Sequence, residues 1–370
     1  MRFRLFVLGL GVILTCIIQA CNFSAHNNPK QPVEKDTADS LPVRGFLFGN
    51  DHPFPQCHAS TIIHLDDGKF MAAWFGGTKE GADDVGIWMT KGNPGHWEKP
   101  FEVAKVNDQP HWNPVLFNPP GGSIYLFFKV GYATQTSPWS TWLKTSDNEG
   151  KTWSEARQLI PDGHDGRGPV RNKPIVLSNG MWIAGASNEI GGWRAFFDRS
   201  NDKGKTWQAT PYLTIDHNDI KGRGLIQPTL WESAPGEVHA LIRSTAGVIY
   251  QSDSKDYGKT WTPAYKTALP NPNSAIDVAK LSDSMLVLAY NPDDKNWGSR
   301  GTLRLAVSFD NGKTWAKGID IEKGGKDDEF SYPAIISYGD TIAVTYTWKR
   351  QKIAFWIGTK KWITDNAQPL

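Results

Sequence analysis

Ser308-Phe-Asp-Asn-Gly-Lys-Thr-Trp315 is the last of four copies of one short phrase, and the spacing of these copies decides the fold. The earlier copies are Ser146-Asp-Asn-Glu-Gly-Lys-Thr-Trp153, Ser200-Asn-Asp-Lys-Gly-Lys-Thr-Trp207 and Ser254-Lys-Asp-Tyr-Gly-Lys-Thr-Trp261. They share the frame S-x-D-x-G-x-T-W, and only the first departs from it, with Asn148 at the Asp position. The closing tryptophans stand 54 residues apart three times over, and a degenerate copy ends 56 residues earlier at Trp97. Such a period indicates one repeated supersecondary unit.

The stretches between the copies predict short β-strands, because they are rich in β-branched, aliphatic and aromatic residues and are bounded by Asp-Gly, Asn-Gly and Pro-Gly pairs. Examples are Ser123-Ile-Tyr-Leu-Phe-Phe-Lys-Val130, Leu303-Arg-Leu-Ala-Val307 and Thr341-Ile-Ala-Val-Thr-Tyr-Thr-Trp348. About four strands in ~50 residues form one blade of a β-propeller. Residues 43–362 number 320, close to six periods of 54. The sequence therefore predicts an all-β fold, a six-bladed β-propeller within residues 43–370, closed by pairing its N-terminal and C-terminal strands.

The repeated phrase itself has the composition of a tight turn. Its Asp supplies side-chain-to-backbone hydrogen bonds, and its Gly accepts a positive φ. We expect the closing tryptophan to pack against its own blade. This is a structural role, so the phrase is not expected to contact a substrate.

The charge of the chain restricts its partners. The formal net charge is only +2 over 370 residues, with no basic cluster, which argues against a nucleic-acid partner. The nine histidines show no metal-ligand spacing, so no metal site is expected. Neither a Gly-rich phosphate loop nor a Gly-x-Ser-x-Gly motif is present, and no cofactor is predicted. A closed propeller has no need to oligomerise, so a monomer is expected.

The N-terminus has the pattern of a secretion signal. A charged start at Met1-Arg-Phe-Arg4 precedes an apolar run from Leu5 to Ile18. The run ends in Ile18-Gln19-Ala20-Cys21, which resembles the lipobox of bacterial lipoproteins, with an ordinary signal peptide as the alternative. We expect a signal peptide at 1–21, lipidation of Cys21, a flexible tether at 22–42, and a lipid-anchored protein of the bacterial cell envelope. Cys57 then has no disulfide partner.

In a propeller the innermost strand of each blade faces the axis, so polar residues at its start are candidates for a site. Each expected blade carries one such segment. The six segments are Cys57-His58-Ala-Ser-Thr, His111-Trp-Asn113-Pro, Arg171-Asn172-Lys173-Pro, Ile226-Gln227-Pro-Thr, Asn271-Pro-Asn273-Ser274 and Ser331-Tyr332-Pro. The alternative is a polar, water-filled channel without catalytic function.

Further candidates are charged residues outside these segments. Arg243 and Arg300 lie near strand ends of consecutive blades, and guanidinium groups suit two-point recognition of a carboxylate. A shared anionic ligand is therefore predicted. The other charged candidates are Arg350, Glu80, Asp83 and Asp84.

With the repeats and the paired arginines, residues ~45–360 resemble the sialidase superfamily, whose members carry these phrases as Asp-box (BNR) repeats. That resemblance implies an exo-glycosidase that holds a substrate carboxylate with arginines and uses a tyrosine nucleophile. Val238-His-Ala-Leu-Ile-Arg243 resembles the segment of the family's second arginine, and Arg300 the third. Phe330-Ser-Tyr332-Pro resembles the tyrosine segment. The acid/base aspartate of the family corresponds to the loop that holds Glu80, Asp83 and Asp84.

Two positions depart from the family pattern. His58 stands where the family has its first arginine, and Gln227 stands where a glutamate assists the tyrosine. Glutamine cannot act as a base. Arg171 and Lys173 are possible replacements for the missing arginine, and Asn113 and Asn273 are further candidates to bind substrate.

His58 is expected to lie next to Tyr332 across the seam between the first and last blades, where an imidazole could act as base or acid. Three functions remain open. The first is a sialidase-like exo-glycosidase on glycans that carry a carboxylate. The second is a lyase or another hydrolase on uronic-acid glycans, with a His/Tyr pair. The third is a glycan-binding propeller without catalysis.

Overall fold

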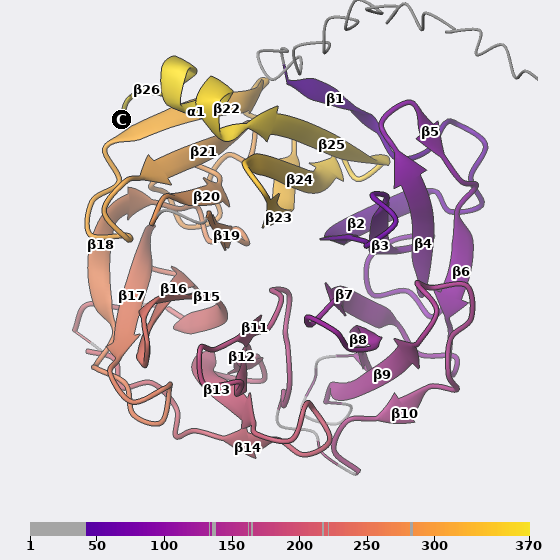
Figure 1. The fold of residues 1–370 in the computed structure, drawn as a ribbon, viewed down its shortest axis with the longest axis horizontal. Coiled ribbons are helices and arrows are strands. Elements are labelled where there is room, and N and C mark those ends of the chain that lie inside the picture. Colours follow the sequence, from indigo (N-terminus) through magenta and orange to yellow (C-terminus); the bar gives the residue numbers. More distant parts are fainter. Residues whose placement is uncertain are drawn as a thin grey trace, which may run out of the picture. The chain divides into compact units, whose positions relative to one another are not determined.

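The computed structural model describes residues 42–370, except residues 133, 135–137, 162, 164–165, 217, 221 and 282–283. The predicted lipidation at Cys21, the signal peptide and the tether lie outside these residues. Six sheets of four or five strands stand in a ring, and the innermost strand of each points to the axis (Figure 1). The six-bladed β-propeller predicted from the 54-residue period is confirmed.

Blades one to three follow in sequence order. The first contains β2 (Gln56–His64), β3 (Phe70–Gly77), β4 (Gly86–Asn93), β5 (His96–Trp97) and β6 (Phe101–Ala104). The second contains β7 (His111–Phe117), β8 (Ile124–Val130), β9 (Ser140–Ser146) and β10 (Arg157–Gln158). The third contains β11 (Ile175–Val176), β12 (Trp182–Asn188), β13 (Arg194–Ser200) and β14 (Gln208–Ala209).

Blades four to six complete the ring. The fourth contains β15 (Leu225–Ala234), β16 (Glu237–Ser244), β17 (Val248–Ser254) and β18 (Tyr265–Pro270). The fifth contains β19 (Asp277–Lys280), β20 (Leu286–Tyr290), β21 (Thr302–Ser308), β22 (Lys317–Lys323) and β26 (Gln368–Pro369). The sixth contains β23 (Phe330–Tyr338), β24 (Thr341–Trp348), β25 (Lys352–Thr359) and β1 (Val43–Phe46).

The ring closes through its last blade, as the sequence predicts. Strand β1, from the beginning of the described chain, pairs antiparallel with β25 and pairs Val43 with Ile357 (Figure 1). Closure removes the open sheet edges that would otherwise remain at the two ends of the chain. It also places the start of the first blade against the last blade, which brings residues about 270 positions apart into one site.

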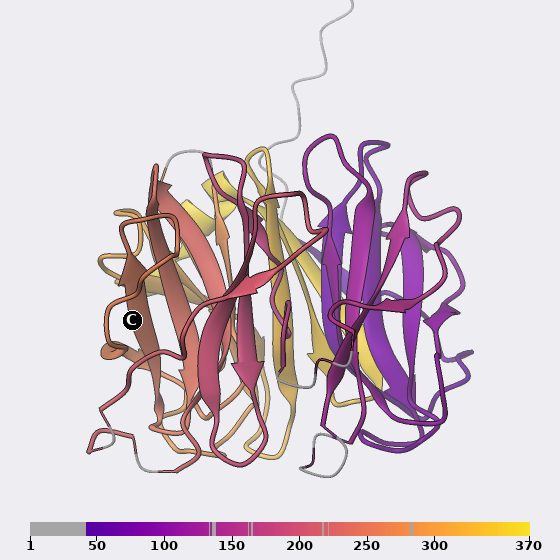
Figure 2. The ribbon, with the colours of Figure 1, turned by 90° about the horizontal axis from the view of Figure 1, so that it is seen from below.

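The hydrophobic core lies between the blades. Inner strands such as β3 are buried along their whole length, because each sheet is covered by a neighbour on both faces. The blades stand side by side around the axis, as the view along the axis (Figure 1) and the view from the side (Figure 2) both show. The one helix among the described residues, α1 (Lys360–Asn366), is short and begins at Thr359, whose hydroxyl accepts from the Trp362 amide. None of the described helices has the length and apolar character to span a membrane.

Each Asp box connects the third and fourth strands of its blade. In the box of blade four, Asp256 Oδ1 accepts from the backbone amides of Lys259 and Thr260, and Oδ2 from the Thr260 hydroxyl. The residue before the glycine has a positive φ in all four boxes. These residues are Glu149 (56°), Lys203 (59°), Tyr257 (60°) and Asn311 (61°). The predicted turn, with side-chain-to-backbone bonds and a left-handed backbone, is confirmed.

The tryptophan at the end of the box has a different partner from the one expected. Trp261 stacks on Phe197 of the preceding blade, with 3.8 Å between ring centroids and 18° between planes. Trp207 likewise meets Phe127 of the preceding blade edge-on at 6.2 Å. The expectation that it packs against its own blade is therefore wrong. The outer turn lies close to the neighbouring sheet, so a large ring reaches across and joins two blades.

Candidate active site on the propeller axis

In all six blades, one residue near the start of the inner strand has a positive φ, which is the left-handed backbone conformation. We call these six residues the axial ring. They are Ala59 (φ 56°), Asn113 (43°), Arg171 (72°), Gln227 (56°), Asn273 (59°) and Tyr332 (53°). In β2, β7, β15 and β23 the pairing register shifts at this point. A β-bulge of this kind redirects a side chain, and a positive φ outside glycine is uncommon.

The axial ring lies within the six segments selected from the sequence, which confirms their common phase. In blade one, however, the left-handed residue is Ala59 and not His58. Non-glycine left-handed residues cost free energy, of order 1–3 kcal/mol each, and cluster at functional sites. Six of them at equivalent positions identify the ring as the feature that positions the site.

Tyr332 lies at the centre of the charged cluster. Its hydroxyl oxygen accepts a hydrogen bond from Arg243 Nη1 at 2.9 Å. The guanidinium carbons of Arg171, Arg243 and Arg300 lie 5.5, 5.6 and 5.6 Å from the centroid of its ring. Because a guanidinium only donates, the Tyr332 oxygen is an acceptor here, and its own proton is available to another group.

Asn273 lies between Arg243 and Arg300 and accepts a hydrogen bond from each of them. Asn273 Oδ1 accepts from Arg243 Nε at 2.8 Å, and its carbonyl oxygen accepts from Arg300 Nη2 at 3.4 Å. Arg243 is buried and Arg300 is half-buried. The two guanidinium groups therefore flank Tyr332 as a pair, which agrees with the predicted shared anionic ligand.

Glu329 was not among the predicted site residues, and Arg350 had no predicted role. Glu329 accepts from Arg300 Nη1 at 3.1 Å and from Arg350 Nε at 2.8 Å, so it joins the two arginines. Arg350 also donates to Glu80 Oε2 at 2.5 Å. A signal for Glu329 was present, since it comes three residues before Tyr332. Arg350 lies on the β24–β25 turn, far from any predicted motif.

His58 lies next to Tyr332, as predicted, with the two rings tilted against each other. Their ring centroids are 4.0 Å apart with 44° between planes. Neither ring nitrogen of His58 has a hydrogen-bond partner among the described protein atoms. Burial, followed by the charges of Arg350, Arg300, Arg171 and Arg243, holds the pKa of His58 well below its usual value. The imidazole is therefore neutral at pH 7, and the same burial and positive charges oppose its protonation.

Gln227 faces Arg243 with its carbonyl. Arg243 Nη1 donates to Gln227 Oε1 at 3.1 Å, and Gln227 Nε2 donates to Glu189 Oε1 at 3.0 Å. The resemblance implies a carboxylate at position 227. Here the carboxylate belongs to Glu189, which is hydrogen-bonded to Gln227. Burial raises the pKa of Glu189, against the opposing effects of the Arg243 charge and the bonds from Gln227 and Ser187. No sequence motif marks Glu189, because it follows β12 in another blade.

The three acids of the β3–β4 loop have different surroundings. Asp84 accepts from the amide and hydroxyl of Thr78, at 2.8 and 2.7 Å, and so orders the loop. Asp83 accepts from the Tyr132 hydroxyl at 2.7 Å. Of the three, Glu80 is the one that contacts the arginine cluster, through Arg350. All three are exposed, and the assignment of a proton donor among them stays a prediction.

Arg171 and Lys173, the possible replacements for the missing arginine, bond to different groups. Arg171 is buried, and its guanidinium donates to the carbonyl oxygens of Ser60, Tyr332 and Pro333. It therefore ties blades one, three and six together. These bonds leave it engaged with the protein backbone, so nothing in this geometry supports the prediction that it binds substrate.

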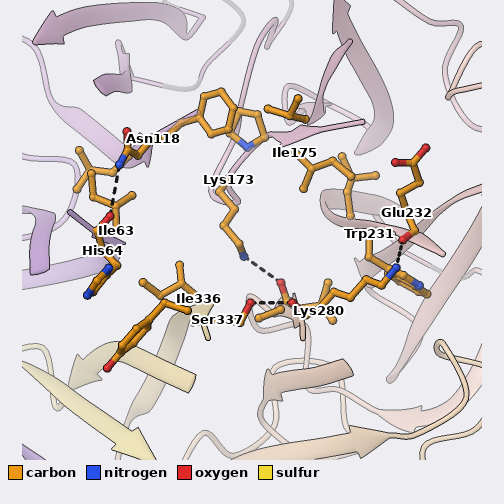
Figure 3. A pocket seen from close by; sticks show the side chains of 18 residues that line it. Ile63, His64, Asn118, Lys173, Ile175, Trp231, Glu232, Lys280, Ile336 and Ser337 are labelled. Atoms are coloured by element: carbon orange, nitrogen blue, oxygen red, sulfur yellow. Dashed lines mark hydrogen bonds between the residues drawn. The ribbon is translucent and has the colours of Figure 1, made fainter. Parts of the chain in front are cut away.

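Lys173 points the other way along the axis. It pairs with Asp277 at 3.0 Å in a cavity of about 530 Å³ lined by the ends of the inner strands, including His64 and Tyr338 (Figure 3). From His58 to His64 strand β2 advances about 20 Å. Lys173 thus faces the central channel, as expected, but Arg171 is not among the residues that line its cavity.

The remaining predicted residue is Asn113, which is buried in the axial ring without a side-chain hydrogen bond to any described residue. Among those residues, no group of three or more His, Cys, Asp or Glu side chains could hold a metal ion. Cys57 is a free, buried thiol, and burial raises its pKa. The chemistry of this site rests on Tyr332, the arginines, His58 and the neighbouring carboxylates.

Comparison with known proteins gives a consistent result. Residues 68–344 match the BNR repeat-like domain family. The chain is 24% identical over 214 residues to a sialidase of Paraclostridium sordellii, a match that covers 53% of this chain and 51% of that protein. It is 29% identical over 212 residues to a sialidase of Bacteroides fragilis (strain YCH46), covering 47% of this chain and 37% of that protein. The matches thus span about half or less of these relatives.

Among solved structures, the Hadza microbial sialidase Hz136 is similar in fold, with a TM-score of 0.70 at 16% identity over 83% of this chain and 66% of that one. The family match covers most of the described chain, and the ring of six blades with its Asp boxes agrees with it. The chain belongs to the BNR repeat-like family, within the sialidase superfamily of β-propellers.

Proposed function

We propose that the protein is a sialidase-like exo-glycosidase that acts on glycans with a terminal carboxylated sugar, with Tyr332 as the nucleophile. The observation that carries this proposal is the contact of the Tyr332 hydroxyl with Arg243 inside a group of arginines. A carboxylated substrate suits such a group, because Arg243 and Arg300 can neutralise the anion next to the reacting carbon. A phenol also suits this position, since a second carboxylate there would repel the substrate.

The reaction would proceed in two steps with retention. Tyr332 Oη forms a bond to the anomeric carbon and transfers its proton to a base, for which neutral His58 is the candidate. The bond from that carbon to the leaving oxygen breaks, and this oxygen takes a proton from an acid of the β3–β4 loop. In the second step water attacks the anomeric carbon and gives its proton to the loop carboxylate. The bond from that carbon to Tyr332 Oη breaks, and the tyrosine oxygen takes back the proton held by the base.

A second candidate function is favoured by one observation, the neutral and unpartnered His58 against Tyr332. On a uronic acid, His58 would remove the proton next to the carboxylate and Tyr332 would protonate the departing oxygen. A carbon–carbon double bond forms as the carbon–oxygen bond breaks. The arginines would stabilise the extra charge on the carboxylate. Gln227, where the resemblance implies a glutamate, fits this elimination as well as it fits hydrolysis.

The deciding experiment measures the purified protein on a fluorogenic α-sialoside and on a panel of uronic-acid oligosaccharides. Hydrolysis of the sialoside, lost in Tyr332→Phe with the melting temperature unchanged, supports the glycosidase. Products that absorb in the far ultraviolet identify unsaturated uronides and support the lyase. A protein that binds these glycans with equal affinity in wild type, Tyr332→Phe and His58→Ala, and turns over none of them, is a binding propeller and refutes both.

A further inference from the structure

A continuous hydrogen-bonded chain connects blade three to the tyrosine of blade six. It runs from Glu189 Oε1 to Gln227 Nε2 (3.0 Å), from Gln227 Oε1 to Arg243 Nη1 (3.1 Å), and from Arg243 Nη1 to Tyr332 Oη (2.9 Å). Its members come from the end of β12, from β15 and β16, and from β23. Among the four side chains of this hydrogen-bonded path, Glu189 is the only carboxylate, and the proposed reaction does not use it.

The direction of each bond follows from the chemistry of the groups. Arg243 has no acceptor, so Gln227 must turn its carbonyl oxygen toward it. The amide nitrogen of Gln227 must then face an acceptor, which Glu189 supplies. An amide turned the other way would direct N–H groups at a guanidinium and leave both donors unsatisfied. Glu189 therefore determines which end of Gln227 meets Arg243.

Glu189 is itself held from a second side. The Ser187 hydroxyl donates to Glu189 Oε1 at 3.0 Å and lies 3.4 Å from the Gln227 backbone amide, which donates to it. Gln227 also has the strained left-handed backbone of the axial ring, with φ at 56°. The carboxylate, the hydroxyl and the strained backbone together restrict the Gln227 side chain to one position.

We propose that Glu189 is a positioning residue for Tyr332, acting through Gln227 and Arg243. It does not touch the reacting atoms. Its carboxylate, from the neighbouring blade, supplies the negative charge that Gln227 lacks. Through Gln227 it holds Arg243 in the position from which Arg243 donates to the Tyr332 hydroxyl. This inference rests on the proposed role of Tyr332, and it makes Gln227 a spacer in place of a base.

Three variants separate orientation from charge. Glu189→Ala removes the acceptor of Gln227 Nε2. Glu189→Gln keeps an acceptor oxygen and removes the charge. The double variant Glu189→Gln with Gln227→Glu exchanges the two side chains, so that a carboxylate at 227 accepts from Arg243 and from the amide at 189. Glu155→Ala, at an exposed glutamate of blade two, is the matched control.

We expect kcat/KM of Glu189→Ala to fall about 10- to 100-fold, as for other residues that orient a directly acting group. Glu189→Gln and the exchanged double variant should recover most of this loss, and Glu155→Ala should equal the wild type. A role in folding alone would lower the melting temperature of Glu189→Ala without such recovery of turnover. Wild-type kcat/KM in Glu189→Ala, or equal losses in all three variants, would overturn the inference.

Crystal structures of the same variants give a readout that needs no substrate. The inference requires that the Arg243 guanidinium leaves the Tyr332 hydroxyl in Glu189→Ala and stays on it in the exchanged variant. An unchanged Arg243 in Glu189→Ala refutes it even if the wild type turns over no tested glycan. An inactive wild type with a displaced Arg243 refutes the proposed function and leaves the positioning role intact.

Discussion

The rim and the axis of this propeller both contain non-glycine residues with a left-handed backbone, but the side chains around these residues differ in kind. At the rim, each Asp box has a left-handed residue, and the side chains around it repeat from blade to blade. Gly204, Gly258 and Gly312 each donate to the box serine at 2.8 or 2.9 Å. On the axis, each blade again has a left-handed residue, but no two neighbouring blades present the same side chain there.

The difference also appears in the hydrogen bonds. At the rim, the box aspartates have all their oxygens engaged, as in Asp310, which accepts from Ser308 and Thr314. On the axis, buried polar atoms such as Asn273 Nδ2 and both ring nitrogens of His58 have no partner among the described atoms. Groups that are fully bonded stabilise the fold, whereas groups left without partners are available to a ligand. The box aspartates thus stabilise the rim, whereas the axis presents polar atoms that could bond a ligand.

The largest expected effect comes from the axis. Arg243→Lys keeps the charge but cannot bond Asn273, Gln227 and Tyr332 together, so kcat/KM should fall by about 100-fold. Arg304→Lys is the control, since Arg304 pairs with Asp320 in the outer part of blade five. Steady-state kinetics on the substrate found for the wild type measure both. Equal activity of Arg243→Lys and wild type would show that the arginine cluster does not act on substrate.

At the rim, the expected loss is one of stability. Asp256→Ala removes the acceptor for two backbone amides and the Thr260 hydroxyl, and should lower the free energy of unfolding by about 1–2 kcal/mol. Activity should stay within two-fold of wild type. Denaturant unfolding measures the change. Asp256→Asn should lose less, because Asn148 in the first box still accepts from the Thr152 amide and donates to the Thr152 hydroxyl.

Acid should weaken the Asp boxes at the rim. Hydrogen bonds from Thr206 lower the pKa of Asp202 to about 2, and that of Asp256 is also about 2, where the bonds from Thr260 outweigh burial. An unfolded Asp titrates near 3.9. These groups therefore stabilise the fold above about pH 4, and this contribution is lost as pH falls toward 2. Thermal melting from pH 5 to 2 should show a drop that the double variant Asp202→Asn, Asp256→Asn reduces; an identical drop would contradict it.

The smallest expected effect is a gain in the free energy of unfolding. Lys203 is exposed and left-handed in the second box, where the fourth box has Asn311. Because asparagine adopts this backbone more readily than lysine, Lys203→Asn should raise stability by about 0.5 kcal/mol. Lys205→Asn, in the same box but outside the left-handed set, should give no gain. A stability change of the same size in both variants would show that backbone strain is not the cause.

Much of this architecture could be predicted from the sequence. The 54-residue period, the box turns and the closure of the ring are confirmed, because they depend on local turn chemistry and on a count of repeats. The six axial segments were also found, since each has polar residues at the expected start of an inner strand. The contact of His58 with Tyr332 followed from the closure. Their catalytic roles stay predictions.

Other features could not be predicted. Glu329 and Glu189 entered the site through contacts with Arg300 and Gln227 of neighbouring blades, and Lys173 pairs with Asp277 in the cavity at the other end of the axis. The box tryptophans were expected on their own blades and pack on the preceding ones. Each of these misses concerns a partner from another blade.

By itself, the sequence determined the repeat, the number of blades and the backbone of each turn, since these are set by residues within one period. The tertiary structure alone decided which charged side chains meet around Tyr332. Long arginine and glutamate side chains can reach several neighbours, and their choice depends on closure of the ring and on the burial of each charge. Local chemistry therefore specifies the blade, and the packing of six unlike blades specifies the site.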